Sequence, residues 1–223
     1  MRTITKLGAF VLVLSMVALA ADKGPVKLTA NAKAGGTPYK GMSDSSKRVP
    51  LFTNLATDNP NGLYFCCSGW ELTGPDWPYG QYGYQWVAVQ FTTTKPRIVH
   101  RLTTSVTYFE TGSYTDFLLS IQADAGGIPS GTPLGTGPWA VTVDSESFGQ
   151  CCSTEFEKVT PGLQLPAGTY WVVWSTEASS DLYAGINYEV LDGVDTVNVA
   201  YYSSANAQWY SYGANDAPAV QVQ

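Results

Sequence analysis

The stretch FLLSIQADAGGIPSG, residues 117–131, is an alternating segment followed by a turn-rich one. Leu119 and Ile121 share one parity, whereas Ser120 and Gln122 share the other. Successive side chains of a strand point to opposite faces, so this alternation predicts a strand with one face in a core. The glycines, proline and serine that follow favour a tight turn.

Similar strand signals recur along the chain, while helix signals are nearly absent. Nine segments are predicted as strands: 86–92, 98–109, 115–123, 139–143, 155–160, 169–176, 182–190, 196–203 and 217–222. Tyr170 to Trp174 is apolar on both parities, which indicates a central strand. About nine short strands joined by turns predict an all-β protein with a single jelly-roll-like antiparallel β-sandwich over residues 49–223.

The first 20 residues have the pattern of a signal peptide. Arg2 and Lys6 are positively charged, Leu7 to Leu19 is apolar, and Ala18-Leu19-Ala20 is a small-x-small cleavage site. The apolar run is shorter than the roughly 20 residues of a membrane-spanning helix. We therefore predict a secreted protein, extracellular or periplasmic, with no membrane span.

Charge divides the remaining chain in two. Residues 21–48 contain six basic and two acidic residues and few large apolar ones, which predicts a flexible basic leader. Residues 49–223 contain four basic and sixteen acidic residues, a net charge of −12. Nucleic acid is not expected as a partner of this acidic domain, because binding to phosphates requires clustered positive charge.

The four cysteines form two adjacent pairs, Cys66-Cys67 and Cys151-Cys152. In an exported chain an even number of cysteines favours disulfides over a metal site. If the two pairs lie on neighbouring antiparallel strands, Cys66 would bond to Cys152 and Cys67 to Cys151, with one bridge on each face, and we favour this arrangement. Two vicinal disulfides are the alternative.

Two groups of aromatic residues are candidates for ligand binding. Aromatic rings in exposed loops can stack on sugar rings, and nearby polar groups can bind the hydroxyls. The first group lies in a loop rich in proline and glycine, and the second lies near the C-terminus. The candidates are Trp77, Tyr79, Tyr82 and Tyr84, and then Tyr202, Trp209, Tyr210 and Tyr212. The neighbouring Trp70 and Trp86 are predicted to lie in the core.

Several of these segments together resemble the secreted bacterial choice-of-anchor sandwich domains, of R-type-like pattern. The matching segments are 66–70, 86–91, 119–131, 163–173 and 217–222, with Trp209. The resemblance implies an extracellular or surface-displayed β-sandwich of uncharacterised role, often tethered by a C-terminal sorting signal. The C-terminal residues Val220 to Gln223 contain no such signal, which argues against that tether.

No catalytic motif is found. The single histidine, His100, lies in a strand pattern and is predicted to be half-buried rather than a general base. Glu71, Glu110, Glu155 and Glu157 could supply a glycosidase pair, but the sequence does not place any two of them at a catalytic separation. No cofactor is predicted. Calcium on loop aspartates such as Asp181, Asp192, Asp195 and Asp216 is a weaker alternative that we do not adopt.

These observations predict an exported, disulfide-bonded, non-catalytic module. Its expected partner is a polysaccharide or a cell-surface component, bound through the aromatic loops. A structural or adhesive protein that self-associates is the main alternative, and a glycoside hydrolase is the third.

Overall fold

The computed structural model describes residues 27–29, 49–54, 64–78, 83–110, 116–142, 153–189, 197–214 and 216–223. These ranges contain fourteen β-strands and no helix, so the chain is all-β as predicted. The proposed signal peptide lies outside them, as does the leader except for residues 27–29. No helix of the described ranges is long and apolar enough to cross a membrane.

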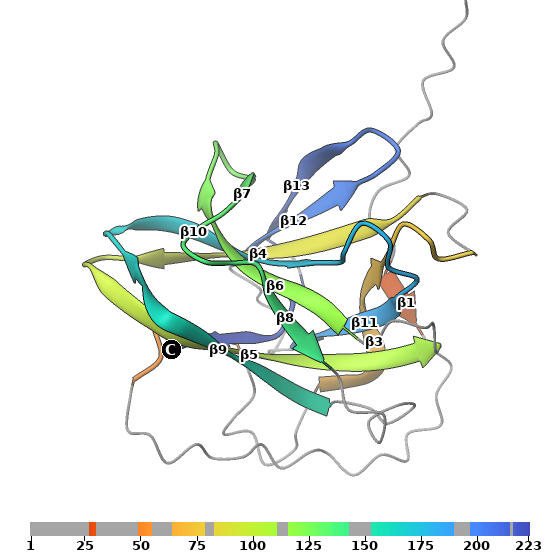
Figure 1. Cartoon of the computed structure of the whole chain (residues 1–223), viewed down its shortest axis with the longest axis horizontal. Helices are drawn as coiled ribbons and strands as arrows, with labels where there is room; N and C mark the ends of the chain where they lie inside the picture. The colour runs from red at the N-terminus through yellow and green to blue at the C-terminus, as the bar shows by residue number, and fades with distance from the viewer. Residues whose placement is uncertain are drawn as a thin grey trace, which may run out of the picture.

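The strands form two antiparallel sheets that pack against each other as a β-sandwich (Figure 1). Sheet I contains, in order, β1 (Lys27–Thr29), β3 (Tyr64–Thr73), β11 (Tyr183–Glu189), β5 (Arg97–Glu110), β14 (Val220–Val222) and β2 (Phe52–Thr53), and β9 (Ser153–Leu165) also pairs with β5. Sheet II contains β13 (Gln208–Ala214), β12 (Asn198–Ser203), β4 (Gln85–Thr93), β10 (Gly168–Ser175), β6 (Asp116–Asp124) and β7 (Pro129–Pro133), and β8 (Trp139–Thr142) also pairs with β6.

Eight of these strands have jelly-roll connectivity. We number these strands 1 to 8 in chain order: β3, β4, β5, β6, β8, β9, β10 and β11. Sheet I then has the spatial order 1-8-3-6 and sheet II the order 2-7-4-5, which is the arrangement of a jelly roll. The predicted jelly-roll-like sandwich is therefore confirmed. The β12–β13 hairpin widens sheet II beside β4, and β14 pairs with β5 next to the end of β11.

Each of the nine predicted strands is present, with ends shifted by a few residues. The strands that the sequence did not predict are β1, β2, β3, β7 and β13. β1, β2 and β7 have three, two and five residues, too few for an alternating pattern to be recognised. The segments of β3 and β13 were interpreted as a cysteine segment and as an aromatic binding group, although both are regular strands.

Alternate residues of the central strands build the core between the sheets. On β10, Tyr170, Val172 and Trp174 are buried in the main cluster, together with Val87 and Val89 of β4. The Trp174 Nε1 donates to the hydroxyl of Thr104 on β5 of sheet I, at 3.0 Å. This satisfies the one polar atom of a large buried ring and joins the two sheets.

One part of the leader is ordered. Residues 27–29 form β1 and pair with β3, Leu28 lying opposite Gly69. The other residues of the predicted flexible leader, 21–26 and 30–48, lie outside the described residues, so the leader stays a prediction. Backbone hydrogen bonds to a sheet edge require no apolar side chains, so composition is a poor guide to them.

The disulfide pairing stays a prediction. Cys66 and Cys67 lie in β3, whose neighbours are β1 and β11, whereas Cys151 and Cys152 lie outside the described residues, just before β9. β9 pairs with β5. β3 and β9 are thus not neighbouring strands, and neighbouring strands were the condition on which the favoured pairing rested.

Candidate functional site

The outer face of sheet II, which points away from sheet I, bears the candidate site. Because Val87 and Val89 point into the core, the alternation of β4 turns Trp86 and Gln90 outward. In Figure 1 the β12–β13 hairpin and β7 both project on this outer side of the sheet. The face therefore has raised borders along two of its sides.

Four aromatic residues meet at one end of this face, and we call them the outer aromatic cluster: Tyr84, Trp86, Tyr202 and Trp209. The Trp86 and Tyr202 rings stack with centroids 4.8 Å apart, and Tyr202 meets Trp209 edge-on at 5.7 Å. Tyr84 lies 5.3 Å from Trp86 and 5.9 Å from Tyr202. All four side chains are partly exposed.

Strand register brings these rings together from distant parts of the chain. Tyr202 of β12 lies opposite Trp86 of β4 on one side and opposite Trp209 of β13 on the other. Directly opposed residues of antiparallel strands place their side chains in contact on the same face. The three rings therefore form a row across three strands.

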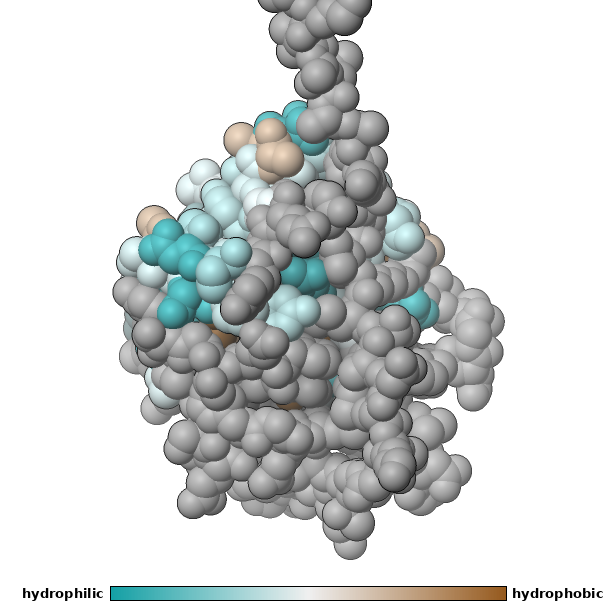
Figure 2. Space-filling model, turned by 90° about the vertical axis from the view of Figure 1, so that its right-hand side faces the viewer, coloured by the Kyte–Doolittle hydropathy of each residue, from teal (hydrophilic) through white to brown (hydrophobic). Residues whose placement is uncertain are grey.

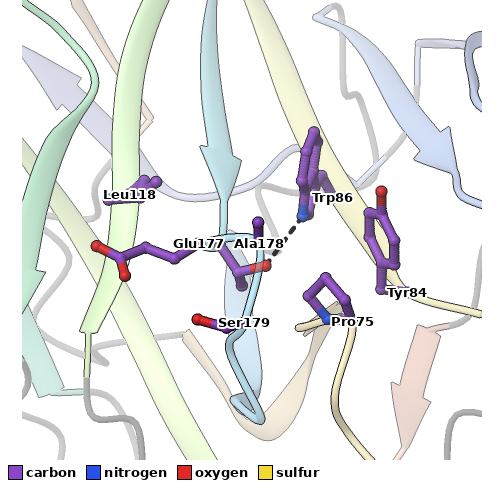
Figure 3. Close-up of a pocket in the computed structure, with 8 residues that line it drawn as sticks. Pro75, Tyr84, Trp86, Leu118, Glu177, Ala178 and Ser179 are labelled. Carbon is purple, nitrogen blue, oxygen red and sulfur yellow. Dashed lines mark hydrogen bonds between the residues drawn. The ribbon is translucent and has the colours of Figure 1, made fainter.

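A pocket of about 670 Å³ opens beside this cluster, at the end of sheet II where β4 and β6 begin and β10 ends. Its lining residues are Pro75, Tyr84, Trp86, Leu118, Thr176, Glu177, Ala178 and Ser179. Figure 3 shows Trp86 and Tyr84 on one side of the pocket, with Leu118 and Glu177 across from them. The volume lies within the range of small-molecule binding sites.

Hydrogen bonds hold the walls of the pocket in place. The Trp86 Nε1 donates to the Thr176 hydroxyl at 3.2 Å, which links β4 to the loop that follows β10. That loop is joined in turn to the loop after β3, because Asp76 N donates to Ser180 O at 3.0 Å and Gly74 N donates to Leu182 O at 2.9 Å. A Cβ atom on Gly74 would lie 2.0 Å from the Ser180 carbonyl oxygen, so this close approach requires glycine.

A second contact positions Tyr84. Its backbone N donates to the Ser204 hydroxyl at 2.7 Å, and Ser204 N donates back to Tyr84 O at 3.2 Å. The preceding Gly83 has a φ of +82°, and a Cβ atom there would collide with Ser204 Oγ. The segment that enters β4 is therefore fixed against the β12–β13 turn.

Two titratable groups near this end of the sandwich are perturbed by burial. Burial, followed by the hydrogen bond and charge of Tyr202, raises the pKa of Tyr84. Burial also raises the pKa of Glu71, which does not line the pocket. Among the described lining residues Glu177 is the single carboxylate, whereas glycoside hydrolysis by the usual mechanism requires two.

The other end of the same face is built differently, from a polar network around Asp124. The Asp124 Oδ1 accepts from Trp171 Nε1 at 2.7 Å and from Gln90 Nε2 at 3.2 Å, and its carboxylate also accepts from the backbone of the following turn. Asn198 Nδ2 donates to Gln90 Oε1 at 2.8 Å. Trp171 is fully buried, in a small cluster separate from the main core.

Of the first predicted group, the structure describes Trp77 and Tyr84, and it places them apart. Trp77 stacks on Tyr183 of β11, with ring centroids 4.8 Å apart, and does not line the pocket. Tyr84 belongs to the outer aromatic cluster and lines the pocket. Tyr79 and Tyr82 lie outside the described residues, so their role stays a prediction.

The second predicted group is divided between the two faces of its strands. Tyr202 and Trp209 join the outer aromatic cluster. Tyr210 and Tyr212 point to the opposite face because they have the other parity, and there Tyr210 stacks on Tyr201 at 5.3 Å while Tyr212 meets the buried Trp70 at 5.5 Å. Strand alternation predicts this separation, because Trp209 and its neighbour Tyr210 must point to opposite faces of β13.

Several site residues were missed. Trp86 was predicted to lie in the core, but it is partly exposed and lines the pocket, although it also packs against the main cluster. The parity of Val87 and Val89 could have shown that it points outward. No sequence signal identified Leu118 or the loop from Thr176 to Ser179, because their contribution depends on which strands are neighbours.

The other candidate groups form no second site in the described residues. His100 is half-buried in β5, as predicted. The side chains of Glu110, Glu155 and Glu157 lie outside the described residues, as do Asp192 and Asp195. Within the described ranges no group of three histidine, cysteine or acidic residues could hold a metal ion.

Comparison with known proteins found no matching protein family, curated protein or solved structure. The resemblance to choice-of-anchor domains therefore stays a prediction.

Proposed function

We propose that this protein is a secreted, non-catalytic module that binds a polysaccharide or a glycosylated cell surface in the pocket beside Trp86. The observation that supports it is the combination of an aromatic wall, made by Tyr84 and Trp86, with the side chains of Glu177 and Ser179 across from it (Figure 3). Sugars present apolar ring faces and polar edges, so they bind to this combination of groups. Lectin domains are among the proteins that use a jelly roll.

Surface hydropathy favours this proposal over self-assembly. Figure 2 shows one side of the molecule, on which the described residues are mostly hydrophilic or of intermediate hydropathy, with small, separate hydrophobic areas. Among the described residues the exposed large apolar side chains are Val49, Ile98 and Tyr212, too few for a broad apolar surface. Self-assembling proteins usually bury such a surface.

The test is a glycan and polysaccharide binding screen of the protein, exported from the full chain into an oxidising compartment, with analysis of reaction products in the same wells. We expect binding without release of product. The change Trp86→Leu should then weaken the binding of the best glycan about 10-fold, because a planar stacking surface worth roughly 1.4 kcal/mol is lost.

Trp77→Leu is the matched control. It also removes an indole ring, but from a residue that stacks on Tyr183 and does not line the pocket. Binding by this control should stay within about 2-fold of the unchanged protein, a difference below 0.5 kcal/mol. Equal losses in both variants would contradict the location of the site, and released product would contradict the non-catalytic part of the proposal. A screen in which no glycan binds would overturn the proposal itself.

A further inference from the structure

The charge of the pocket indicates a narrower ligand class. Two aromatic rings and one carboxylate, Glu177, line it, and no lysine, arginine or histidine does. Aromatic faces attract cations through the negative charge density of the ring, and a nearby carboxylate adds to this attraction. A neutral sugar could stack on the rings and donate a hydrogen bond to Glu177, but it would lack the attraction between opposite charges.

The basic residues of the domain lie elsewhere. From residue 49 onward they are Lys95, Arg97, Arg101 and Lys158. Lys95 follows the end of β4, whereas the pocket lies at its beginning, and the other three belong to β5 and β9 of sheet I. None of these four residues lines the pocket, and neither does Lys27 of β1, the one basic residue that the structure describes before residue 49.

Acidic residues, in contrast, occur in the segments that border the pocket. Asp76 follows the lining residue Pro75, and its backbone N donates to the carbonyl oxygen of Ser180. Asp116 precedes the lining residue Leu118 by two positions and has the same parity. Asp181 comes two positions after the lining residue Ser179. The described segments that border the pocket therefore carry acidic residues and no basic one, a distribution that favours cations over anions as ligands.

We infer that the pocket takes a sugar that carries a protonated amine, such as a glucosamine unit of a deacetylated polysaccharide. This inference rests on the proposed glycan-binding function. The ammonium group would be attracted by the aromatic rings and by the charge of Glu177, and the sugar ring would lie along the aromatic wall of Tyr84 and Trp86. The structure thus combines a site for a cation with a site for a sugar ring.

The experiment is calorimetric titration of the full exported protein at about pH 6, below the pKa of an amine. Four probes are compared: a β-1,4-linked glucosamine hexamer, the N-acetylglucosamine hexamer, the glucose hexamer and choline. We expect the glucosamine hexamer to bind about 10-fold more tightly than the acetylated one, because acetylation removes the charge. Raising the salt from about 0.1 M to about 0.5 M should weaken the binding of the glucosamine hexamer and leave the neutral hexamers unaffected.

Glu177→Gln should lower the affinity for the glucosamine hexamer about 10-fold and so abolish most of this preference. Asp216→Asn, which removes one negative charge outside the pocket lining, should retain the preference. Equal losses in the two variants would overturn the role of Glu177, because they would show an effect of net charge alone.

The remaining outcomes separate the two proposals. If the three hexamers bind equally well, the inference of an amine fails and the proposed glycan binding stands. If choline binds as tightly as the glucosamine hexamer, the site recognises an ammonium group without a sugar, which overturns the inference. If no hexamer binds and the wider glycan screen is also negative, the proposed function fails.

Discussion

Trp86 and Trp171 lie on neighbouring strands and on the same outer face of sheet II, yet their surroundings differ. Trp171 is fully buried, and its indole N–H donates to the carboxylate of Asp124. Trp86 is half-exposed, donates to the neutral hydroxyl of Thr176, and lines a pocket. Both are outward-facing tryptophans of a jelly roll, and the difference between them comes from their neighbours.

The comparison shows how one face can serve two purposes. Around Asp124, hydrogen bonds from Trp171, Gln90 and the following turn converge on one carboxylate, so that end stabilises the sheet. Around Trp86, the side chains of Glu177 and Ser179 are exposed at the surface beside the pocket, where a ligand can reach them. Stability and binding should therefore respond to different tryptophans.

The largest expected effect comes from the same substitution at both positions. Trp171→Leu should lower the free energy of unfolding by about 3 kcal/mol or more, because it leaves a cavity and removes a hydrogen bond to a charged group. Trp86→Leu should lower it by about 1 kcal/mol, because that ring is partly in water already. Urea unfolding of both variants measures the two changes, and equal losses would contradict the division of the face.

A second pair of substitutions isolates the hydrogen bond of Trp171. Trp139 is also buried, but its Nε1 has no hydrogen-bond partner within the described structure. The changes Trp171→Phe and Trp139→Phe remove the same volume, but only the first removes a hydrogen bond to a carboxylate. Trp171→Phe should therefore cost about 1.5–3 kcal/mol more in unfolding free energy than Trp139→Phe.

Thermal and urea unfolding of the two phenylalanine variants provide the measurement. Trp139→Phe should be close to neutral, because it removes a polar group that makes no hydrogen bond. A larger loss for Trp139→Phe than for Trp171→Phe would show that packing, and not the Asp124 hydrogen bond, determines the stability of the outer face.

Much of the fold could be predicted from the sequence because alternation is a local property. The segment 117–131 shows the strand and its turn, and both are present in the structure as β6 and the turn that follows. Leu119 and Ile121 lie in the core as their parity predicts, but Ser120 and Gln122 of the other parity are buried as well. Central β10 was likewise recognisable because Tyr170 to Trp174 is apolar on both parities. β3 was not predicted, although its second half, Trp70 to Thr73, alternates between apolar and polar residues.

The candidate site was harder to predict because it depends on which strands are neighbours. Tyr202 lies opposite Trp86, 116 positions earlier in the chain, through the pairing of β12 with β4. Aromatic composition identified Tyr84, Tyr202 and Trp209, but it also selected Trp77, which stacks on Tyr183. Composition does not contain the register, so it could not distinguish these cases.

The smallest expected effect concerns the response of the polar network to acid. Although burial raises the pKa of Asp124, the hydrogen bonds from Trp171, from the backbone of Gly127, from Gln90 and from the backbone of Gly126 together lower it below its ordinary value. A carboxyl whose pKa is lower in the folded state stabilises the fold above its unfolded pKa of about 3.9. That contribution is lost as the pH falls through the folded pKa.

Asp124→Asn should therefore be less stable than the unchanged protein at neutral pH, and this difference should disappear in acid. The loss at neutral pH should be less than about 1 kcal/mol, because the carboxylate is in contact with water and the amide oxygen of asparagine can still accept from Trp171. Urea unfolding at several values between about pH 7 and pH 2 measures it. A difference that stayed constant down to the lowest pH would show that the charge of Asp124 adds nothing to the network, and that its shape alone holds Trp171 in place.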